Sequence, residues 1–226
     1  MNTIKKSLML VSVFFCLVNP LIAHHPAMEK ELFTLREPAT DRKAFRASMK
    51  KVGEYLALEV SKDLDIKPMT VETVLGVEAT HNLVSEDIVL VTILRAGLPL
   101  LKGFASVFPD AEMGFFGMAR DEETLKAKVD YIALPPMEGK TVIIVDPMIA
   151  TGGSMLDAIK VIEPYNPKKI IVAGAFATVQ GMERINKHNP NVIFYNGVVD
   201  PILNDVGYIV PGLGDAGDRA FGNKCR

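Results

Sequence analysis

The sequence has little that would cross-link it covalently or bind it to a nucleic acid. It contains two cysteines among 226 residues, Cys16 and Cys225, at opposite ends of the chain, which suggests no disulfide framework. It has no dense basic block: 25 Lys and Arg against 27 Asp and Glu give a net charge of −2, which argues against a main role on nucleic acid. Apolar residues make up 49% of the chain, enough for the core of one α/β domain with at most a small appendage.

Two nucleotide-binding motifs and a metal-binding spacing are missing as well. No Gly-x-Gly-x-x-Gly turn follows any strand that we predict, which argues against a nucleotide-binding dehydrogenase, and the complete P-loop motif of the NTPases is absent. The four histidines, His24, His25, His81 and His188, show no ligand spacing. We therefore predict no metal ligand from the protein itself.

The N-terminus resembles a signal peptide. Lys5 and Lys6 precede an apolar run over residues 7–18, too short to predict a membrane span, and Ala23 is a small residue at a plausible cleavage point. We predict a signal-like or anchor-like extension over residues 1–23 and one domain over residues 24–226, which cleavage after Ala23 would leave whole. A start codon assigned too far upstream, or an added anchor, would also account for the extension.

Apolar patterning predicts strands that alternate with helices. Continuously apolar runs such as Ile88 to Ile93 are expected of strands covered on both faces. The alternation predicts an α/β fold with a mostly parallel central sheet flanked by helices, in which ligands bind at the carboxyl ends of strands. The charged stretch 120–136, which ends in two prolines, predicts a protruding hairpin arm. The predicted strands are 88–93, 113–118, 141–145, 170–175 and 192–196, and the predicted helices start at Asp41 or cover 98–107, 154–162 and 181–188.

One segment, residues 145–154, predicts a ligand site. A buried strand ends at Asp146 and the chain then turns through small residues into a helix. Backbone N–H groups of residues 151–154, together with the positive end of that helix, can bind an anion, and the two glycines let the backbone approach the ligand closely. Asp146 can accept hydrogen bonds from vicinal hydroxyls. The segment therefore predicts a site for a sugar phosphate.

The same segment resembles the phosphoribosyl-diphosphate (PRPP) motif of the type I phosphoribosyltransferases, in the form found in uracil phosphoribosyltransferases. Residues 207–219, Gly-Tyr-Ile-Val-Pro-Gly-Leu-Gly-Asp-Ala-Gly-Asp-Arg, are similar to the uracil-binding loop of that family, and residues 93–97 and 118–125 extend the likeness. The resemblance begins near His25 and runs to the last few residues. It implies the type I fold with a C-terminal base-binding hood, and attack of a uracil ring nitrogen on the anomeric carbon of PRPP to give UMP and diphosphate.

The resemblance also implies a role for individual residues. Arg95 would clamp diphosphate oxygens, and Arg120, on a mobile arm, would close over the diphosphate. Asp215 would act on the PRPP side through sugar hydroxyls, water or magnesium. The implied PRPP-binding residues are Arg95, Arg120, Asp146, Pro147, Met148, Ile149, Ala150, Thr151, Gly152, Gly153, Ser154 and Asp215, of which Arg95, Arg120, Asp146 and Asp215 are catalytic; those implied for uracil are Ile209, Gly214, Asp215 and Ala216.

The sequence departs from the family pattern in a few places. Ala119 stands where a tyrosine usually precedes the arginine of the arm, and Ala220 and Asn223 replace an aliphatic residue and a threonine. Many relatives have two adjacent acids in the PRPP motif, whereas Pro147 here follows Asp146. We therefore expect the implied Mg²⁺ to be bound mainly through oxygens of PRPP.

The resemblance implies a homodimer or larger homo-oligomer, sometimes activated by GTP, with no nucleic-acid partner and no stable membrane association. Because PRPP is made and used in the cytosol, we expect a cytoplasmic enzyme of pyrimidine salvage. One alternative is a regulatory, RNA-binding relative that binds PRPP or nucleotides without turnover, which would need a basic face. Another is a secreted, inactive derivative, against which the retention of every ligand-facing motif residue argues.

Overall fold

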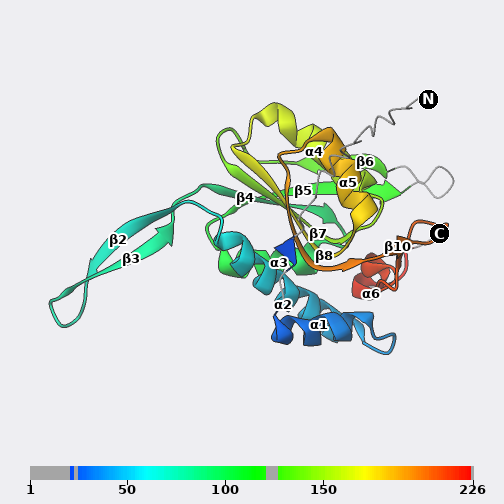
Figure 1. The fold of residues 1–226 in the computed structure, drawn as a ribbon, viewed down its shortest axis with the longest axis horizontal. Helices are drawn as coiled ribbons and strands as arrows, with labels where there is room; N and C mark the ends of the chain where they lie inside the picture. The colour runs from blue at the N-terminus through cyan, green and yellow to red at the C-terminus, as the bar shows by residue number, and fades with distance from the viewer. Residues whose placement is uncertain (1–20, 23–24, 121–126, 225–226) are drawn as a thin grey trace, which may run out of the picture.

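The structure, a computed structural model, describes residues 21–22, 25–120 and 127–224. Helices cover both faces of a central sheet, and one long hairpin projects from this body (Figure 1). The strands are β1 (Leu21–Ile22), β2 (Ile66–Glu72), β3 (Glu78–Val84), β4 (Ile88–Leu94), β5 (Glu112–Arg120), β6 (Ala127–Ala133), β7 (Thr141–Ile149), β8 (Lys169–Thr178), β9 (Ile193–Asp200), β10 (Ile202–Leu203) and β11 (Ile209–Val210). The helices are α1 (Pro26–Arg36), α2 (Arg42–Ser61), α3 (Leu98–Val107), α4 (Gly153–Ile162), α5 (Val179–His188) and α6 (Ala216–Phe221), with a 3-10 turn η1 (Glu163–Tyr165).

The central sheet has seven strands in the order β1-β9-β8-β7-β4-β5-β6. Every neighbouring pair is parallel except β5 and β6. The mostly parallel sheet predicted from the sequence is therefore confirmed. Its carboxyl ends, where ligands bind in such folds, lie beside the C-terminal residues 202–222, which we call the hood (β10, β11 and α6).

Alternate residues of the central strands enter two separate cores. Leu90, Ile143 and Ile171 pack with α1, α2 and α3 on one face of the sheet. Val89 and Ile144 pack with α4 and α5 on the other (Figure 1). Because both faces are covered, these strands read as continuous apolar runs in the sequence.

The predicted elements are found, with some changes at their ends. The helix over residues 98–107 is confirmed, and Asp41 caps α2 by accepting the N–H of Ala44 at 2.7 Å. Strand β7 is longer than predicted: it continues beyond Asp146 to Ile149, with Met148 opposite Phe176 of β8. Asp146 therefore lies inside the strand and not at its tip. Pro147 lacks an N–H, which made the strand look shorter from the sequence.

The predicted arm corresponds to β5 and β6, which pair antiparallel at the edge of the sheet, with the intervening residues 121–126 outside the described part. Another hairpin, β2–β3, projects from the body and was not predicted (Figure 1). Residues on both faces of its strands are almost all exposed, so the sequence shows no alternation between buried and exposed positions.

The base of the projecting hairpin rests on a charge cluster at the amino ends of the central strands. Glu86, with a side chain only 2% exposed, accepts hydrogen bonds from Lys169 Nζ at 2.7 Å, from the Asp65 N–H at 2.8 Å and from the Thr141 hydroxyl. Burial raises the pKa of Glu86, but these hydrogen bonds outweigh that effect and lower the pKa to about 2. Lys168 joins at the rim, 2.6 Å from Asp65 and 3.3 Å from Glu86.

Strand β1 bears on the expected boundary at residue 24. Leu21 and Ile22 pair in parallel with Tyr195 and Asn196 of β9, at the edge of the sheet. Cleavage after Ala23 would remove this strand, and the expected boundary at residue 24 stays a prediction. None of the helices in the described residues is long and apolar enough to cross a membrane.

Candidate active site

A cleft of about 770 Å³ opens at the carboxyl end of β7. One wall is the end of β7 with the loop and the start of α4, a second is the start of α5, and a third is the turn between β10 and β11. The cleft thus joins the predicted sugar-phosphate segment to the hood. Its lining residues are Asp146, Met148, Ile149, Ala150, Thr151, Gly152, Gly153, Ser154, Met155, Asp157, Gln180, Arg184, Leu203, Asn204, Asp205 and Gly207.

The loop before α4, residues 150–154, has the conformation of an anion site, and we call it the phosphate corner. Gly152 adopts φ +72° and is the N-cap of α4, with no side-chain hydrogen bond to the cap. The N–H of Gly153 has only a long 3.4 Å contact with Thr151 Oγ1. The first-turn N–H groups are therefore free to bind a negatively charged group at the positive end of the helix.

Helix α5 supports the phosphate corner from behind. Thr178 Oγ1 donates to the Ala150 carbonyl at 2.7 Å and accepts the N–H of Gly181 at 3.0 Å. The backbones are in such close contact that a Cβ on Gly152 would lie 2.5 Å from the Gly181 carbonyl oxygen. Arg184 Nη1 donates to the Thr151 carbonyl at 3.3 Å and lines the cleft. No local pattern in the sequence marks Arg184, because it lies 33 residues beyond Thr151 on a separate helix.

Asp146 presents its carboxyl group to the cleft with little to stabilise a charge. Burial raises its pKa to about 7, and the hydrogen bond from the Met148 N–H offsets only part of this. Among the side chains that the structure describes, none forms an ion pair with Asp146. A carboxyl group in this state is suited to accept hydrogen bonds from a ligand, which would replace the missing solvent.

Arg95 follows β4, as predicted, but its guanidinium contacts the hood. Nη2 donates to Asp218 Oδ1 at 3.3 Å and to the Gly222 carbonyl at 3.1 Å, while Nε is buried without a partner. Arg95 does not line the cleft around the phosphate corner. The structure therefore brings Arg95 together with the hood, next to the strand that carries Asp146.

The hood is built around the segment that resembles a uracil-binding loop. Asp215 caps α6, with its Oδ1 accepting the N–H of Asp218 at 2.8 Å. Ile209 and Ala216 are buried, and Gly214 is exposed. The expected uracil residues thus lie within one short segment. In it, Gly214 stands between Leu213, which is buried, and Asp215, which caps α6.

A Gly-x-Gly-x-x-Gly spacing does follow a strand in the structure, which corrects the sequence analysis. Gly212, Gly214 and Gly217 come after β11, a two-residue strand that was not predicted, and lead into α6. Strand β11 pairs antiparallel with β10 and belongs to no parallel β-α-β unit. Because the dinucleotide motif needs such a unit, the argument against a dehydrogenase holds on the fold.

The remaining predicted residues stand as follows. Pro147 is buried in β7, beside the cleft but not lining it. Arg120 is the last residue of β5, opposite Ala127, and its side chain lies outside the described part, as does the mobile arm expected after it. The described residues contain no group of three or more His, Cys, Asp or Glu side chains that could hold a metal ion.

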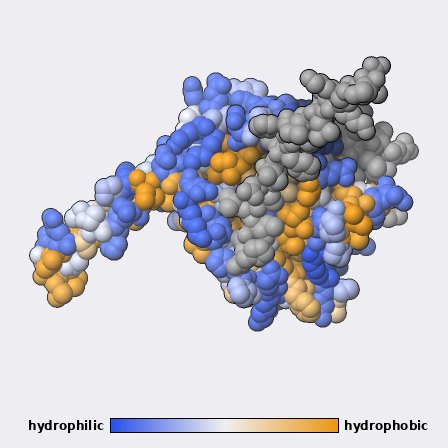
Figure 2. Space-filling view, in the orientation of Figure 1, coloured by the Kyte–Doolittle hydropathy of each residue, from blue (hydrophilic) through white to orange (hydrophobic). Residues whose placement is uncertain are grey.

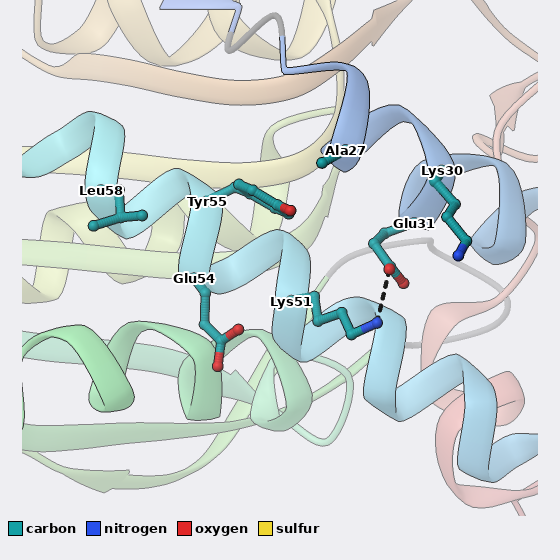
Figure 3. A pocket seen from close by; sticks show the side chains of 7 residues that line it. All are labelled: Ala27, Lys30, Glu31, Lys51, Glu54, Tyr55 and Leu58. Atoms are coloured by element: carbon teal, nitrogen blue, oxygen red, sulfur yellow. Dashed lines mark hydrogen bonds and ion pairs between the residues drawn. The ribbon is translucent and has the colours of Figure 1, made fainter.

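A second hollow, of about 440 Å³, lies between α1 and α2, away from the phosphate corner. In this hollow Lys51 Nζ lies 2.9 Å from Glu31 Oε1, and Tyr55 forms part of the wall (Figure 3). No glycine lines this hollow, so it has no counterpart of the glycine-rich loop at the phosphate corner. The cleft at β7 is therefore the candidate active site.

Comparison with known proteins shows the family of this chain. The family model described as Uracil phosphoribosyltransferase matches residues 22–223. The chain is 40% identical over 205 residues to a uracil phosphoribosyltransferase of Dictyoglomus thermophilum, covering 90% of this chain and 99% of the relative. It is 41% identical over 197 residues to that of Aquifex aeolicus, covering 87% and 95%. The solved structure of the AQ2163 protein from Aquifex aeolicus is similar with a TM-score of 0.85 and 39% identity, over 89% of this chain and 97% of that one. The chain belongs to the uracil phosphoribosyltransferase family.

Proposed function

We infer that this protein transfers the phosphoribosyl group of 5-phospho-α-D-ribose 1-diphosphate to a ring nitrogen of uracil, forming UMP and releasing diphosphate. The observation that carries this proposal is the single cleft between the phosphate corner and the hood. One side offers backbone N–H groups for a phosphate, and the other is the β10–β11 turn, which includes Gly207, the first residue of the family's base-binding segment. The proposed uracil residues Ile209, Gly214 and Ala216 do not line this cleft but follow Gly207 in the hood. A sugar phosphate in the cleft could therefore lie next to a base that is held by the hood.

We propose that the phosphate corner binds the 5-phosphate and that Asp146 binds the ribose hydroxyls. Because its pKa is raised to about 7, Asp146 is only partly ionised near neutral pH in the free protein. Two hydroxyl donors on the ribose would favour the ionised carboxylate and lower that pKa on binding. Ribose recognition would thus be coupled to loss of a proton from Asp146.

Arg95 and Arg120 are proposed to bind the diphosphate. Its negative charge grows on the leaving oxygen as the anomeric carbon becomes cation-like, and fixed guanidinium groups stabilise that charge in the transition state. Arg95 would exchange its 3.3 Å contact with Asp218 for the stronger attraction of the diphosphate. Asp215, which caps α6, is proposed to contribute from the PRPP side through hydroxyls or water.

Backbone groups at Ile209, Gly214 and Ala216 are proposed to recognise uracil. Uracil presents two carbonyl oxygens and a ring N–H, which backbone N–H and C=O groups can complement. Cytosine presents a different edge and would leave buried polar groups unpaired, so the hood would reject it.

Mg²⁺ is proposed to enter with PRPP. The cleft is lined by oxygen donors, including Asp146, and Mg²⁺ is often held by one or two carboxylates together with substrate phosphates and water. When bound, the ion would neutralise part of the diphosphate charge.

We propose a homodimer or larger homo-oligomer, for which the β2–β3 hairpin is the structural support. Val74, Leu75 and Val77 are 103%, 85% and 64% exposed at its turn, and Figure 2 shows apolar residues at the tip of the projection. An isolated two-stranded hairpin is marginally stable in water, so contact with a second copy would stabilise it. Sedimentation of the protein with Val74 and Leu75 changed to Ser tests the proposal, and an unchanged mass would count against it.

Two further proposals rest on the resemblance. Activation by GTP is tested by adding GTP to the turnover assay. A cytoplasmic location is proposed because PRPP is made there, and the mature N-terminus by mass spectrometry tests it. Loss of residues before His24 would speak for export.

The decisive experiment is incubation of the purified protein with PRPP, Mg²⁺ and labelled uracil, with cytosine as the control base. UMP formed from uracil but not from cytosine is expected. Failure to bind labelled PRPP at millimolar Mg²⁺ would overturn the proposal. Binding of PRPP without turnover, with retention on RNA at moderate salt, would favour the regulatory alternative.

A further inference from the structure

Helix α1 ends in an arginine that is bound to the end of β9. Arg36 donates Nη2 to Asp200 Oδ1 at 2.7 Å and Nη1 to Oδ2 at 3.0 Å, so the guanidinium and the carboxylate are joined by two parallel bonds. The Asp200 side chain is 5% exposed, and the Arg36 guanidinium lies 4.6 Å from the ring centroid of Phe176. Such a two-point, charge-assisted pair fixes direction as well as distance.

The same pair holds one residue of the hood by both of its backbone polar groups. Arg36 Nη1 donates to the Gly212 carbonyl at 2.8 Å, and the Gly212 N–H donates to Asp200 Oδ2 at 3.0 Å. Gly212 has φ +54°, and a Cβ there would lie 2.1 Å from the Ile209 carbonyl oxygen. The turn between Ile209 and Gly214 is therefore fixed to the body of the protein at Gly212.

This position matters because the groups proposed for uracil are backbone groups on both sides of Gly212. A side chain can adjust by changing rotamer, whereas a backbone group moves only when the turn moves. Small errors in the placement of a reacting ring reduce turnover strongly. The backbone groups would therefore be placed correctly for hydrogen bonds to uracil only if Gly212 is held in position.

We propose that Arg36 and Asp200 are positioning residues for the base: they hold the uracil-binding turn without touching uracil. The inference rests on the proposed uracil site in the hood. It adds residues far from the family motifs quoted above, since Arg36 lies 176 residues before Gly212.

The hood should stay attached when this pair is changed, which makes the proposal testable. Arg219 forms a separate tie, with Nη2 donating to the Glu37 carbonyl at 2.6 Å, Nη1 to the Leu213 carbonyl at 3.0 Å and Nη1 also to the Leu35 carbonyl. Its guanidinium lies 4.6 Å from the ring centroid of Phe45. Loss of Arg36 would therefore loosen the Gly212 turn while α6 stays in place.

The experiment compares Arg36→Met, Arg36→Lys and Asp200→Asn with Glu31→Gln as a matched control. Glu31 is also a buried partner of an ion pair on α1, with Lys51, but it faces α2 and not the hood. Arg36→Met is expected to lower kcat/KM for uracil by up to about 100-fold, with KM for PRPP little changed. Arg36→Lys keeps the charge but not the two-point geometry, so its kcat/KM for uracil should lie between those of Arg36→Met and the wild type. Glu31→Gln should lower the melting temperature and leave both KM values unchanged.

A second measurement does not depend on turnover. Hydrogen exchange of the backbone amides in the turn, residues 209–214, should accelerate in Arg36→Met and in Asp200→Asn, and stay as in the wild type in Glu31→Gln, while the amides of α6 keep their wild-type exchange in all three. A rise in KM for PRPP as large as the loss of kcat/KM for uracil, an unchanged kcat/KM for uracil, or the same change in the control would overturn the proposal. If the wild type makes no UMP, the proposed function fails, while unchanged exchange in the Arg36 variants separately refutes the tie to the turn.

Discussion

At the amino ends of the central strands, Glu86 is surrounded by donors, whereas at the carboxyl end of β7 Asp146 receives a hydrogen bond from one backbone amide. Burial acts to raise the pKa of both carboxyl groups, yet their pKa values move in opposite directions, to about 2 and to about 7. The difference comes from the neighbours: Glu86 accepts hydrogen bonds from Lys169 and from the Thr141 hydroxyl, whereas none of the described side chains forms an ion pair with Asp146.

The comparison separates a carboxylate that stabilises the fold from one that awaits a ligand. Glu86 has its partners in the folded chain, so its charge favours the folded state. Asp146 lacks them, so its charge disfavours the folded state until a ligand supplies hydrogen bonds. Unsatisfied buried acids of this kind mark functional sites more often than paired ones do.

The largest effect is expected from Asp146→Asn, measured as kcat/KM for PRPP. We expect a loss of about 1,000-fold, because the amide cannot accept hydrogen bonds from two ribose hydroxyls as a carboxylate can. Asp110→Asn, the same change at an exposed position beyond α3, is the control and should be as active as the wild type. A fully active Asp146→Asn protein would remove Asp146 from the site.

The next effect concerns the other end of the sheet. Glu86→Gln is expected to lower the free energy of unfolding by about 3 kcal/mol, because Lys169 is left without its buried partner. Turnover per folded molecule should not change, since Glu86 lies at the opposite edge from the cleft. Urea denaturation with a parallel UMP assay measures both, and a loss of activity without loss of stability would contradict the comparison.

The pH dependence of stability should show the two groups separately. The pKa of Asp146 is raised from 3.8 to about 7, so its favourable contribution is complete below about pH 4 and is lost as the pH rises through 7. The pKa of Glu86 is lowered from 4.5 to about 2, so its contribution is present above about pH 4.5 and is lost as the pH falls through 2. Each slope is at most about 1.4 kcal/mol per pH unit.

The two variants sharpen this prediction. Asp146→Asn should flatten the decline between about pH 4 and 7 and be more stable than the wild type at pH 8, and Glu86→Gln should flatten only the acid limb. Thermal or urea unfolding at a series of pH values would show it. An unchanged slope in Asp146→Asn would mean that another group titrates there.

The smallest effect is expected from Lys168→Met. The Lys168 side chain is 41% exposed and lies 3.3 Å from Glu86, whereas Lys169 is 21% exposed and lies at 2.7 Å. Water and salt screen the outer lysine more, so its loss should move the urea midpoint less than Lys169→Met does. A larger shift of the urea midpoint in Lys168→Met than in Lys169→Met would show that the more exposed lysine contributes more to stability.

The sequence predicted most of the sheet because burial on both faces produces continuous apolar runs. Strands 88–93 and 170–175 and the helix over 98–107 were found close to where they were placed. The β2–β3 hairpin was missed because its residues are exposed on both faces, so no hydrophobic period marks it. Strand β7 was cut short at Asp146 because Pro147 reads as a break.

For the candidate site, the sequence pointed to residues that are close together in the chain and missed contacts between distant segments. Residues 150–154 form a loop within one segment, and the cleft opens onto it. The contact of Arg95 with Asp218 joins residues 123 apart, and Arg36 reaches Asp200 across 164. No local pattern encodes such pairs, because each arginine alone looks like a surface residue.

Helix α5 approaches the phosphate corner so closely that Gly181, which lies outside every motif, tolerates a side chain as poorly as Gly152, which lies inside one. A Cβ on Gly181 would lie 2.3 Å from the Ala150 carbonyl oxygen, closer than atoms can approach without a shift of the backbone. A search for disabling substitutions should therefore recover Gly181 along with Gly152, although 29 residues separate them in the sequence. Two stretches of chain, each unable to bear a side chain at the point of contact, together shape the floor on which the substrate phosphate would rest.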